Sequence, residues 1–213
     1  MPPAPSGHSR DSAMHSVMQW ASVSATHDSL PEAVAQAADR LLEALSGREP
    51  DLVLVFASAS FATHFAALPG LLRREFDNAQ LYGCLGVGVI GNARELEQQP
   101  ALALIGAVLP EVQLHGVHLE HQQVPPIYAE RSLWDSTLHH AGHTPECLLL
   151  LTDPHSFVTE PLLKGLDRHF PQAMKLGGLA SGMEQPGLPC LLLNDRTYSS
   201  GALCLGMSWQ PAG

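Results

Sequence analysis

The chain has 213 residues, of which 45% are hydrophobic and 15% are charged, and its formal net charge is −10. This composition is typical of a folded globular protein with one domain, or one domain with an internal duplication, and it excludes a disordered chain. The 11 Lys and Arg residues form no basic cluster, so we expect neither nucleic acid nor a membrane surface as a partner. No apolar run reaches the roughly 20 residues that span a bilayer.

The N-terminus and the cysteines indicate where the protein works. Residues 1–16 are rich in Pro, Ser, Gly and His and lack the apolar core of a signal peptide, so we expect a disordered leader. Three of the four cysteines lie in apolar runs, as buried free thiols do, and none forms a CxxC motif. They are Cys84, Cys147, Cys190 and Cys204. We therefore expect a reducing, cytoplasmic location; a Cys190–Cys204 bridge across a hairpin is the alternative.

Apolar periodicity predicts a strand, a helix and a second strand at the start of the chain. Residues 17–24 are strand-like. Asp28 or Ser29 is expected to cap the helix that follows, and Gly47 to end it. The run 51–56 is short, continuous and rich in Val and Leu, which is typical of a strand buried on both faces.

A helix, a strand and a glycine-rich turn are predicted next. The helix over 60–76 contains Pro69, so we expect it to be kinked or split there. The strand at 80–84 enters a glycine-rich turn over 83–91. This order of elements is typical of an α/β protein.

The pattern of elements starts again after a long polar connection. Strands at 102–108 and 112–119 join at a hairpin signal. The connection over 122–145, with a short helix expected at 133–141, has a length that usually joins larger units. The elements expected after it are a strand at 146–151, a helix marked by apolar residues from Phe157 to Phe170, and strands at 174–178, 190–194 and 200–209.

An internal repeat is the most informative feature of the sequence. Residues 76–88 align without gaps to residues 170–182, and five pairs are identical: Phe76/Phe170, Ala79/Ala173, Gly83/Gly177, Leu85/Leu179 and Gly88/Gly182. We predict two β-α-β-β-β units, 51–119 and 146–209, joined by 120–145 and packed with pseudo-two-fold symmetry. The expected fold class is α/β, with mixed sheets layered with helices.

The two glycine turns are the first candidates for a ligand-binding site. Each follows a predicted strand, and ligands of α/β folds often bind at the carboxyl ends of strands. Glycine lets a ligand or another backbone approach closely; the alternative is that these glycines only allow tight turns. The candidate residues are Gly83, Cys84, Gly86 and Gly88 in the first turn, and Gly177, Gly178 and Ser181 in the second. The Gly-x-x-Gly-x-Gly spacing, with no helix directly after it, does not fit a dinucleotide, so we expect no cofactor.

Charged side chains near the turns supply the remaining candidates. Arg94 could hold a carboxylate and Glu95 an ammonium, so that together they would bind an amino acid. The alternative is a solvated hairpin loop. Asp153 follows a predicted strand, where it could contact a ligand or cap the next helix.

Metal and nucleophile chemistry have weaker signals. His139 and His143 could share a helix face, but a glycine lies between them and no Cys or carboxylate completes a metal-ligand spacing, so we expect no metal. Cys84 and His155 could form a nucleophile and base pair if their loops meet. The second repeat has Gly178 at the Cys84 position, so the repeat does not support it, and we expect no catalytic residues.

Several short motifs occur in a characteristic order. They are Trp20-Ala-Ser, the strand 51–56 with Ala57-Ser58, Gly83-Cys84 with Gly88-Val-Ile-Gly91, Arg94-Glu-Leu-Glu97, Leu109-Pro110 and Gly177-Gly-Leu-Ala-Ser-Gly182. Over about 17–209 the chain resembles the N-terminal region of the FIST family (F-box and intracellular signal transduction). The resemblance implies a sensory domain of signalling proteins that binds small ligands such as amino acids, with no established catalytic residues. The family's C-terminal FIST region does not follow, so the output is expected from a signalling partner, or the chain is a fragment.

Three hypotheses for the function follow. The first is a small-molecule sensor whose pocket walls are the glycine turns, with binding that shifts conformation or self-association, for example as a homodimer. The second is a non-catalytic scaffold that docks a partner protein through an exposed apolar patch. The third is a hydrolase or transferase that uses Cys84 or a His, and it requires a His within hydrogen-bond reach of the Cys84 sulfur.

Overall fold

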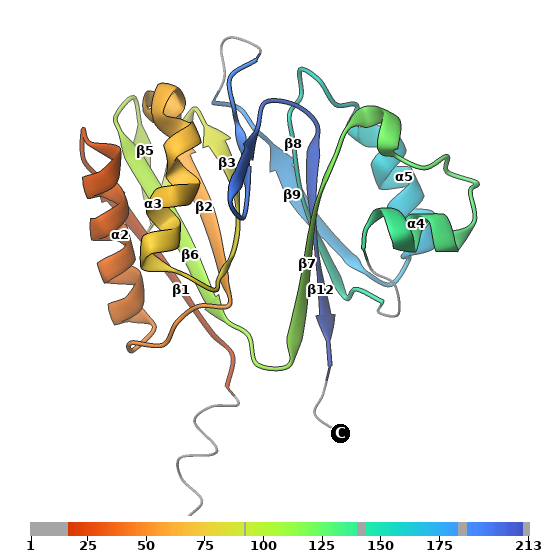
Figure 1. The fold of residues 1–213 in the computed structure, drawn as a ribbon, viewed down its shortest axis with the longest axis horizontal. Coiled ribbons are helices and arrows are strands. Elements are labelled where there is room, and N and C mark those ends of the chain that lie inside the picture. The colour runs from red at the N-terminus through yellow and green to blue at the C-terminus, as the bar shows by residue number, and fades with distance from the viewer. Residues whose placement is uncertain (1–16, 92, 140–143, 183–186, 211–213) are drawn as a thin grey trace, which may run out of the picture.

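The computed structural model describes residues 17–91, 93–139, 144–182 and 187–210. Two β-sheets pack face to face, and helices cover the outer face of each, so that the molecule has four layers (Figure 1). The predicted α/β class with mixed sheets is confirmed. The expected leader lies outside the described residues. Within the described part of the chain, no helix is long and apolar enough to cross a membrane.

The first sheet has six strands in the order β1-β6-β2-β3-β10-β11. Only β2 and β3 pair in parallel, and every other neighbouring pair in this sheet is antiparallel. The strands are β1 (Gln19–Thr26), β2 (Leu52–Ser58), β3 (Gln80–Gly86), β6 (Ala101–Val108), β10 (Leu191–Leu193) and β11 (Arg196–Tyr198). The apolar run predicted at 51–56 is thus a central strand, and its Leu52, Val53 and Val55 are fully buried.

Two helices cover the outer face of this sheet. Helix α2 (Leu30–Ala44) begins after Ser29, as predicted, although the Ser29 side chain makes no capping hydrogen bond. The predicted helix over 60–76 is split, also as predicted. A 3₁₀ helix, η1 (Ala59–Ala67), comes first and α3 (Leu68–Glu75) follows. Pro69 lies in the first turn of α3, where its missing N–H and fixed φ are tolerated.

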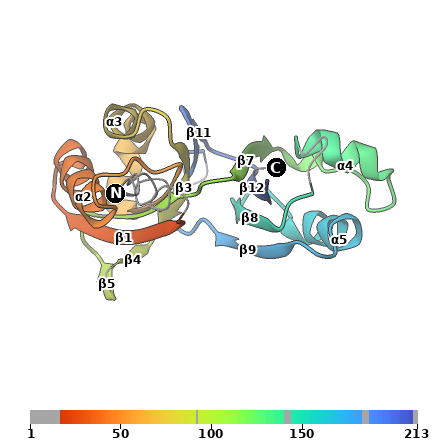
Figure 2. The same cartoon turned by 90° about the horizontal axis from the view of Figure 1, so that it is seen from below.

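The second sheet has four strands in the order β7-β12-β8-β9. Again only one pair, β8 and β9, is parallel. The strands are β7 (Val112–Leu119), β8 (Cys147–Thr152), β9 (Met174–Leu179) and β12 (Ala202–Trp209). Helices α4 (Arg131–Thr137) and α5 (Thr159–His169) lie on its outer face (Figure 2), and the short 3₁₀ helix η2 (His121–Gln123) follows β7.

The hairpin predicted between 102–108 and 112–119 is wrong. Strand β6 pairs with β1 on one side and β2 on the other, so it has no free edge for β7, and β7 joins the second sheet. The strand predicted at 190–194 in the second repeat is β10, which extends the first sheet instead and pairs there with β11, a strand that the sequence analysis did not predict. Strands β7 and β10 therefore each pair with a strand of the other predicted unit, whereas β2, β3 and β6 pair within the first unit and β8, β9 and β12 within the second. The internal repeat stays a prediction. Strands β4 (Gly88–Gly91) and β5 (Arg94–Glu97) form a separate hairpin.

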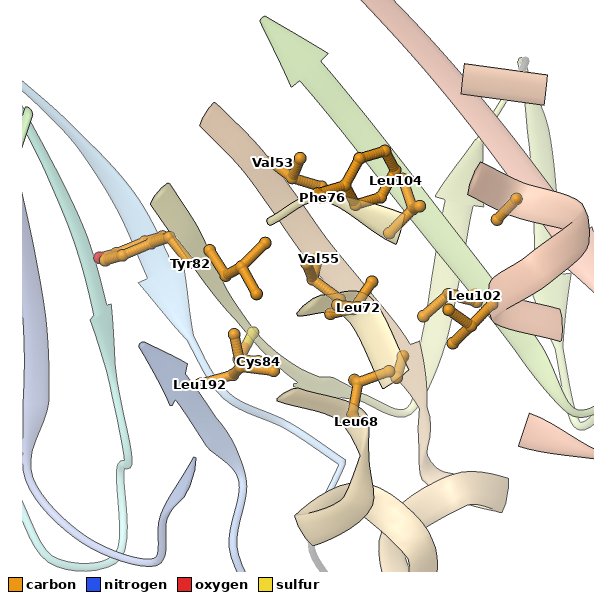
Figure 3. Close-up of a cluster of buried hydrophobic side chains, with 14 of the residues drawn as sticks. Val53, Val55, Leu68, Leu72, Phe76, Tyr82, Cys84, Leu102, Leu104 and Leu192 are labelled. Atoms are coloured by element: carbon orange, nitrogen blue, oxygen red, sulfur yellow. The ribbon is translucent and has the colours of Figure 1, made fainter. Parts of the chain in front are cut away.

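Tyr82 joins the two sheets through the core. Its side chain is fully buried, and its hydroxyl lies 2.8 Å from the Leu149 carbonyl oxygen of β8 and 3.0 Å from the Leu203 carbonyl oxygen of β12. Figure 3 shows Tyr82 pointing toward the second sheet, away from Val55 and Leu72. Alternate residues of β3 therefore serve two different cores, one between the sheets and one under the helices.

A matched pair of helix glycines tests the packing of the helix layers. A Cβ at Gly165 of α5 would lie 1.9 Å from the ring of Trp134, whereas a Cβ at Gly70 of α3 would meet nothing within 4 Å. We predict that Gly165→Ala destabilises the protein by about 1–3 kcal/mol through overpacking. Gly70→Ala should be neutral or stabilise by up to about 1 kcal/mol, because alanine favours helix. Urea unfolding of both variants measures this, and equal effects would contradict the packing described.

Candidate functional site

The two glycine segments meet at one cavity of about 410 Å³ between the sheets. The parallel strands β2 and β3 end on one side of it and β9 ends on the other. Its lining residues come from both sheets: Leu54, Phe56, Cys84, Leu85, Gly86 and Gly88 on the side of the first, and Leu149, Leu151, Gly177, Gly178, Leu179 and Ser181 on the side of the second. The cavity thus lies at the carboxyl ends of parallel strands, where α/β folds commonly bind ligands.

Direct contacts hold the two glycine segments together. The Ser181 N–H donates to the Leu85 carbonyl oxygen at 3.3 Å, and the Val87 N–H donates to the Ser181 hydroxyl oxygen at 3.3 Å. A Cβ at Gly182 would lie 2.7 Å from the Leu85 Cβ. This close approach is the reason for glycine at that position.

The cavity wall is mainly apolar. Six of its lining side chains are leucine or phenylalanine, and none of the described lining residues carries a charge. The polar groups are the Ser181 hydroxyl, the Cys84 thiol and the backbone of the glycines. A space of this kind suits a neutral ligand that presents one or two polar groups to the glycine backbone.

Gly83 has a different role from its neighbours. A Cβ at Gly83 would lie 1.9 Å from the Val55 carbonyl oxygen, and a Cβ at Gly177 would lie 1.9 Å from the Leu150 carbonyl oxygen. Each glycine therefore allows close pairing of a parallel strand pair. Gly177 also borders the cavity, whereas Gly83 is not among its lining residues.

The charged candidates lie elsewhere. Arg94 lines a separate hollow of about 310 Å³ that Arg40 also lines. Glu95 is exposed on the β4–β5 hairpin and follows Arg94 directly, so the two side chains point to opposite faces of β5. The carboxylate of Asp153 accepts hydrogen bonds from the His155 N–H at 3.2 Å and the Ser156 hydroxyl at 2.5 Å. Asp153 therefore shapes the loop after β8, while Arg94 and Glu95 form no joint site at the cavity.

The sequence reasoning missed the six leucine and phenylalanine residues of the wall, four of which lie on β2 and β8. Leu54 and Phe56 belong to β2, and Leu149 and Leu151 to β8. Both strands are continuous apolar runs, so no alternation of polar and apolar residues indicates which face borders a cavity. The period of two was the available signal, because Leu54 and Phe56 share a face with each other.

The described residues give little support to the nucleophile hypothesis or to a metal site. No histidine is among the described residues that line the cavity beside Cys84. Burial raises the pKa of the Cys84 thiol to about 12, so it is protonated and a poor nucleophile near neutral pH. No group of three His, Cys, Asp or Glu side chains in the described ranges could hold a metal ion. His143 lies outside those ranges.

All four cysteines are free thiols. The alternative Cys190–Cys204 bridge does not form: Cys204 lies in β12 of the second sheet, Cys190 precedes β10 of the first, and both are free.

A family model matches most of the chain. The FIST N domain model covers residues 51–211. The chain belongs to the FIST N domain family. FIST domains are generally sensory domains of signal transduction.

The relatives of this FIST domain are longer proteins. An uncharacterized protein of Mycobacterium tuberculosis is 29% identical over 172 residues, which are 79% of this chain and 42% of that protein. An uncharacterized protein of Mycobacterium bovis is 24% identical over 176 residues, which are 81% of this chain and 43% of that protein. The chain therefore spans less than half the length of these curated relatives.

Among solved structures, a cyanuric acid hydrolase from A. caulinodans matches 92% of this FIST domain and 69% of its own chain. The TM-score is 0.42 and the sequence identity is 11%.

Buried thiols make the stability of this FIST domain sensitive to alkaline pH. Burial is the main cause that raises the pKa of Cys84, Cys190 and Cys204 to about 12, and burial also raises the pKa of Tyr82 well above its usual value. The folded protein keeps protons that the unfolded chain releases from about pH 9 upward. We predict that the free energy of unfolding holds its full value below pH 9 and falls as the pH rises toward 12.

Urea unfolding at a series of pH values measures this loss. One such thiol contributes up to about 1.4 kcal/mol per pH unit, so Cys204→Ala should give a shallower pH profile than the wild type. Profiles that stay parallel would contradict the prediction.

Proposed function

We propose that this FIST domain is a sensory domain that binds a small, neutral and largely apolar ligand in the cavity between its sheets. The observation that carries the proposal is the convergence of Gly86, Gly88, Gly177 and Gly178 on one cavity of about 410 Å³. Ligand pockets usually have volumes of about 300–1,000 Å³, with apolar walls and a few polar groups. The four free thiols are in keeping with the expected cytoplasmic location.

The wall chemistry favours a neutral ligand over an amino acid. A zwitterion would bring an ammonium and a carboxylate against leucine side chains, and burial of unpaired charges is costly. The predicted partners for those charges, Arg94 and Glu95, do not line this cavity. An amino acid would need the separate hollow lined by Arg40 and Arg94.

Ligand binding at this place would act on both sheets at once. Cys84 and Gly86 belong to the first sheet, and Gly178 and Leu179 to the second. A ligand in contact with both would favour one arrangement of the sheets over others. This is a direct route from binding to a signal that a partner protein could read.

A thermal-shift screen tests the proposal. Neutral probes such as indole, benzyl alcohol and isobutyramide are compared with the amino acids. A ligand at 100 times its Kd contributes about 2.7 kcal/mol, which raises the Tm of a domain of this size by about 5–10 °C. We expect such a rise with neutral apolar probes. A rise in Tm with amino acids but with none of the neutral probes would contradict the proposal of a neutral ligand.

Two variants locate the binding. Leu54→Trp adds bulk at the cavity wall and should remove the thermal shift. Leu133→Trp, at a side chain of α4 that is 47% exposed, is the matched control and should keep it. Each variant's own Tm without ligand is the baseline. An unchanged shift in Leu54→Trp would place the ligand elsewhere.

A further inference from the structure

Strand β9 forms an open, apolar edge of the second sheet. It pairs with β8 on one side, and no described strand pairs with its other side. Figure 2 shows β9 at the border of the molecule, beside β8 and α5. Three of its six side chains are large, apolar and more than half exposed: Met174 (61%), Leu176 (51%) and Leu179 (58%). Long exposed apolar edges are rare in proteins that work alone, because they recruit further strands.

The corresponding strand of the first sheet is covered. β3 pairs in parallel with β2, as β9 does with β8, and the sequence alignment places Tyr82 opposite Leu176 and Leu85 opposite Leu179. Tyr82 and Leu85 are fully buried, and β10 pairs antiparallel along the outer edge of β3. At β9 the apolar side chains are present and the covering strand is not among the described residues.

The backbone of β9 offers hydrogen bonds at its open edge. The N–H groups of Met174 and Ala180 donate toward β8, to the carbonyl oxygens of Glu146 and Thr152. Because successive residues of a strand direct their backbone groups to opposite sides, the N–H and C=O groups of residues 175, 177 and 179 face outward. These three positions are symmetric about Gly177.

The usual protection of an edge strand is weak here. Proline is absent from β9, and its one charged residue is Lys175. The Lys175 ammonium donates to the Phe170 carbonyl oxygen at 2.7 Å and lies 3.3 Å from the Asp167 carboxylate. The charge of Lys175 is thus paired within its own chain and does not protect the edge against the addition of another strand.

We propose that β9 pairs antiparallel with β9 of a second copy of this chain, about a two-fold axis at Gly177. In this register Lys175 faces Leu179 of the second copy, and every outward backbone group finds a partner. Leu176 faces Gly178 of the second copy, where a Cβ would meet nothing within 4 Å. The exposed leucine of each copy therefore fills the space that the glycine of the other leaves open, and the two second sheets join into one.

Neighbouring apolar surface extends the contact beyond the strand. A hollow of about 240 Å³ lies between β9 and α5 and is lined in part by Leu163, Leu176 and Leu179. Leu163 and Val158 are 38% and 58% exposed. Specific interfaces need more than a single strand pair, and this continuous patch supplies additional area.

Analytical ultracentrifugation of the full chain tests the association. In a concentration series that extends to the high micromolar range, we expect a species with twice the 22.8 kDa mass of the chain. Met174→Lys with Leu176→Lys places charges on the edge at exposed positions and should give a monomer with an unchanged circular dichroism spectrum. Leu133→Lys, at an equally exposed leucine of α4, is the matched control and should remain dimeric.

Disulfide trapping tests the register. Residues 176 and 178 of opposite copies form a non-hydrogen-bonded pair, whose Cα separation of about 4.5 Å permits a disulfide. A mixture of Leu176→Cys and Gly178→Cys chains should crosslink on oxidation, and each variant alone should not. Crosslinking of Leu176→Cys with itself would overturn the register. A wild-type chain that stays monomeric at all concentrations would overturn the proposal. The open edge of β9 would then be available to a different polypeptide, such as a segment of the kind that the longer relatives contain.

The association needs no ligand for its test, so its failure and that of the proposed ligand binding are distinguishable.

Discussion

The distance between the two sheets is set where Tyr82 crosses from one to the other. Its ring spans the inter-sheet space, and its buried hydroxyl lies within hydrogen-bond distance of carbonyl oxygens on β8 and β12. Further along the same face of β3 come Cys84 and Gly86, which are small. The distance between the sheets stays the one that Tyr82 sets, but the side chains on this face of β3 become smaller toward the end of the strand. The cavity is a consequence of that decrease in size, and a buried phenol that donates its one hydrogen between two carbonyl oxygens is a costly contact to break.

The sequence predicted the elements better than their partners. The apolar run at 51–56, the split at Pro69 and the strand at 80–84 follow from local rules, and each is present. The β6–β7 hairpin was wrong because a turn signal at Pro110 reports a change of direction but not which edge is free. Both edges of β6 are taken by β1 and β2, and β1 lies far away in the sequence. Pairing at such range is settled by burial of whole faces, which no local window contains.

The candidate site shows the same division. The identical glycines at 83 and 177 marked two segments that meet, and their neighbours line one cavity. The period of two places Gly83 and Cys84 on opposite faces of β3, but it does not tell which of the two faces borders a cavity. The sequence pattern also could not place Arg94, which lies on the β4–β5 hairpin and lines the hollow that Arg40 also lines. A charge close in sequence to a glycine turn is therefore weak support for a charged ligand, and the neutral wall is the stronger constraint on what can bind.

Strand β9 connects the proposed ligand site to the proposed association. Gly177, Gly178 and Leu179 line the cavity and also form the open edge. A ligand that orders these residues lowers the entropic cost of adding a strand to them, and an added strand does the same for the ligand. Such coupling is reciprocal, so each event must strengthen the other by the same factor. A sensor built in this way needs no long path between its input and its output, because one short strand belongs to both.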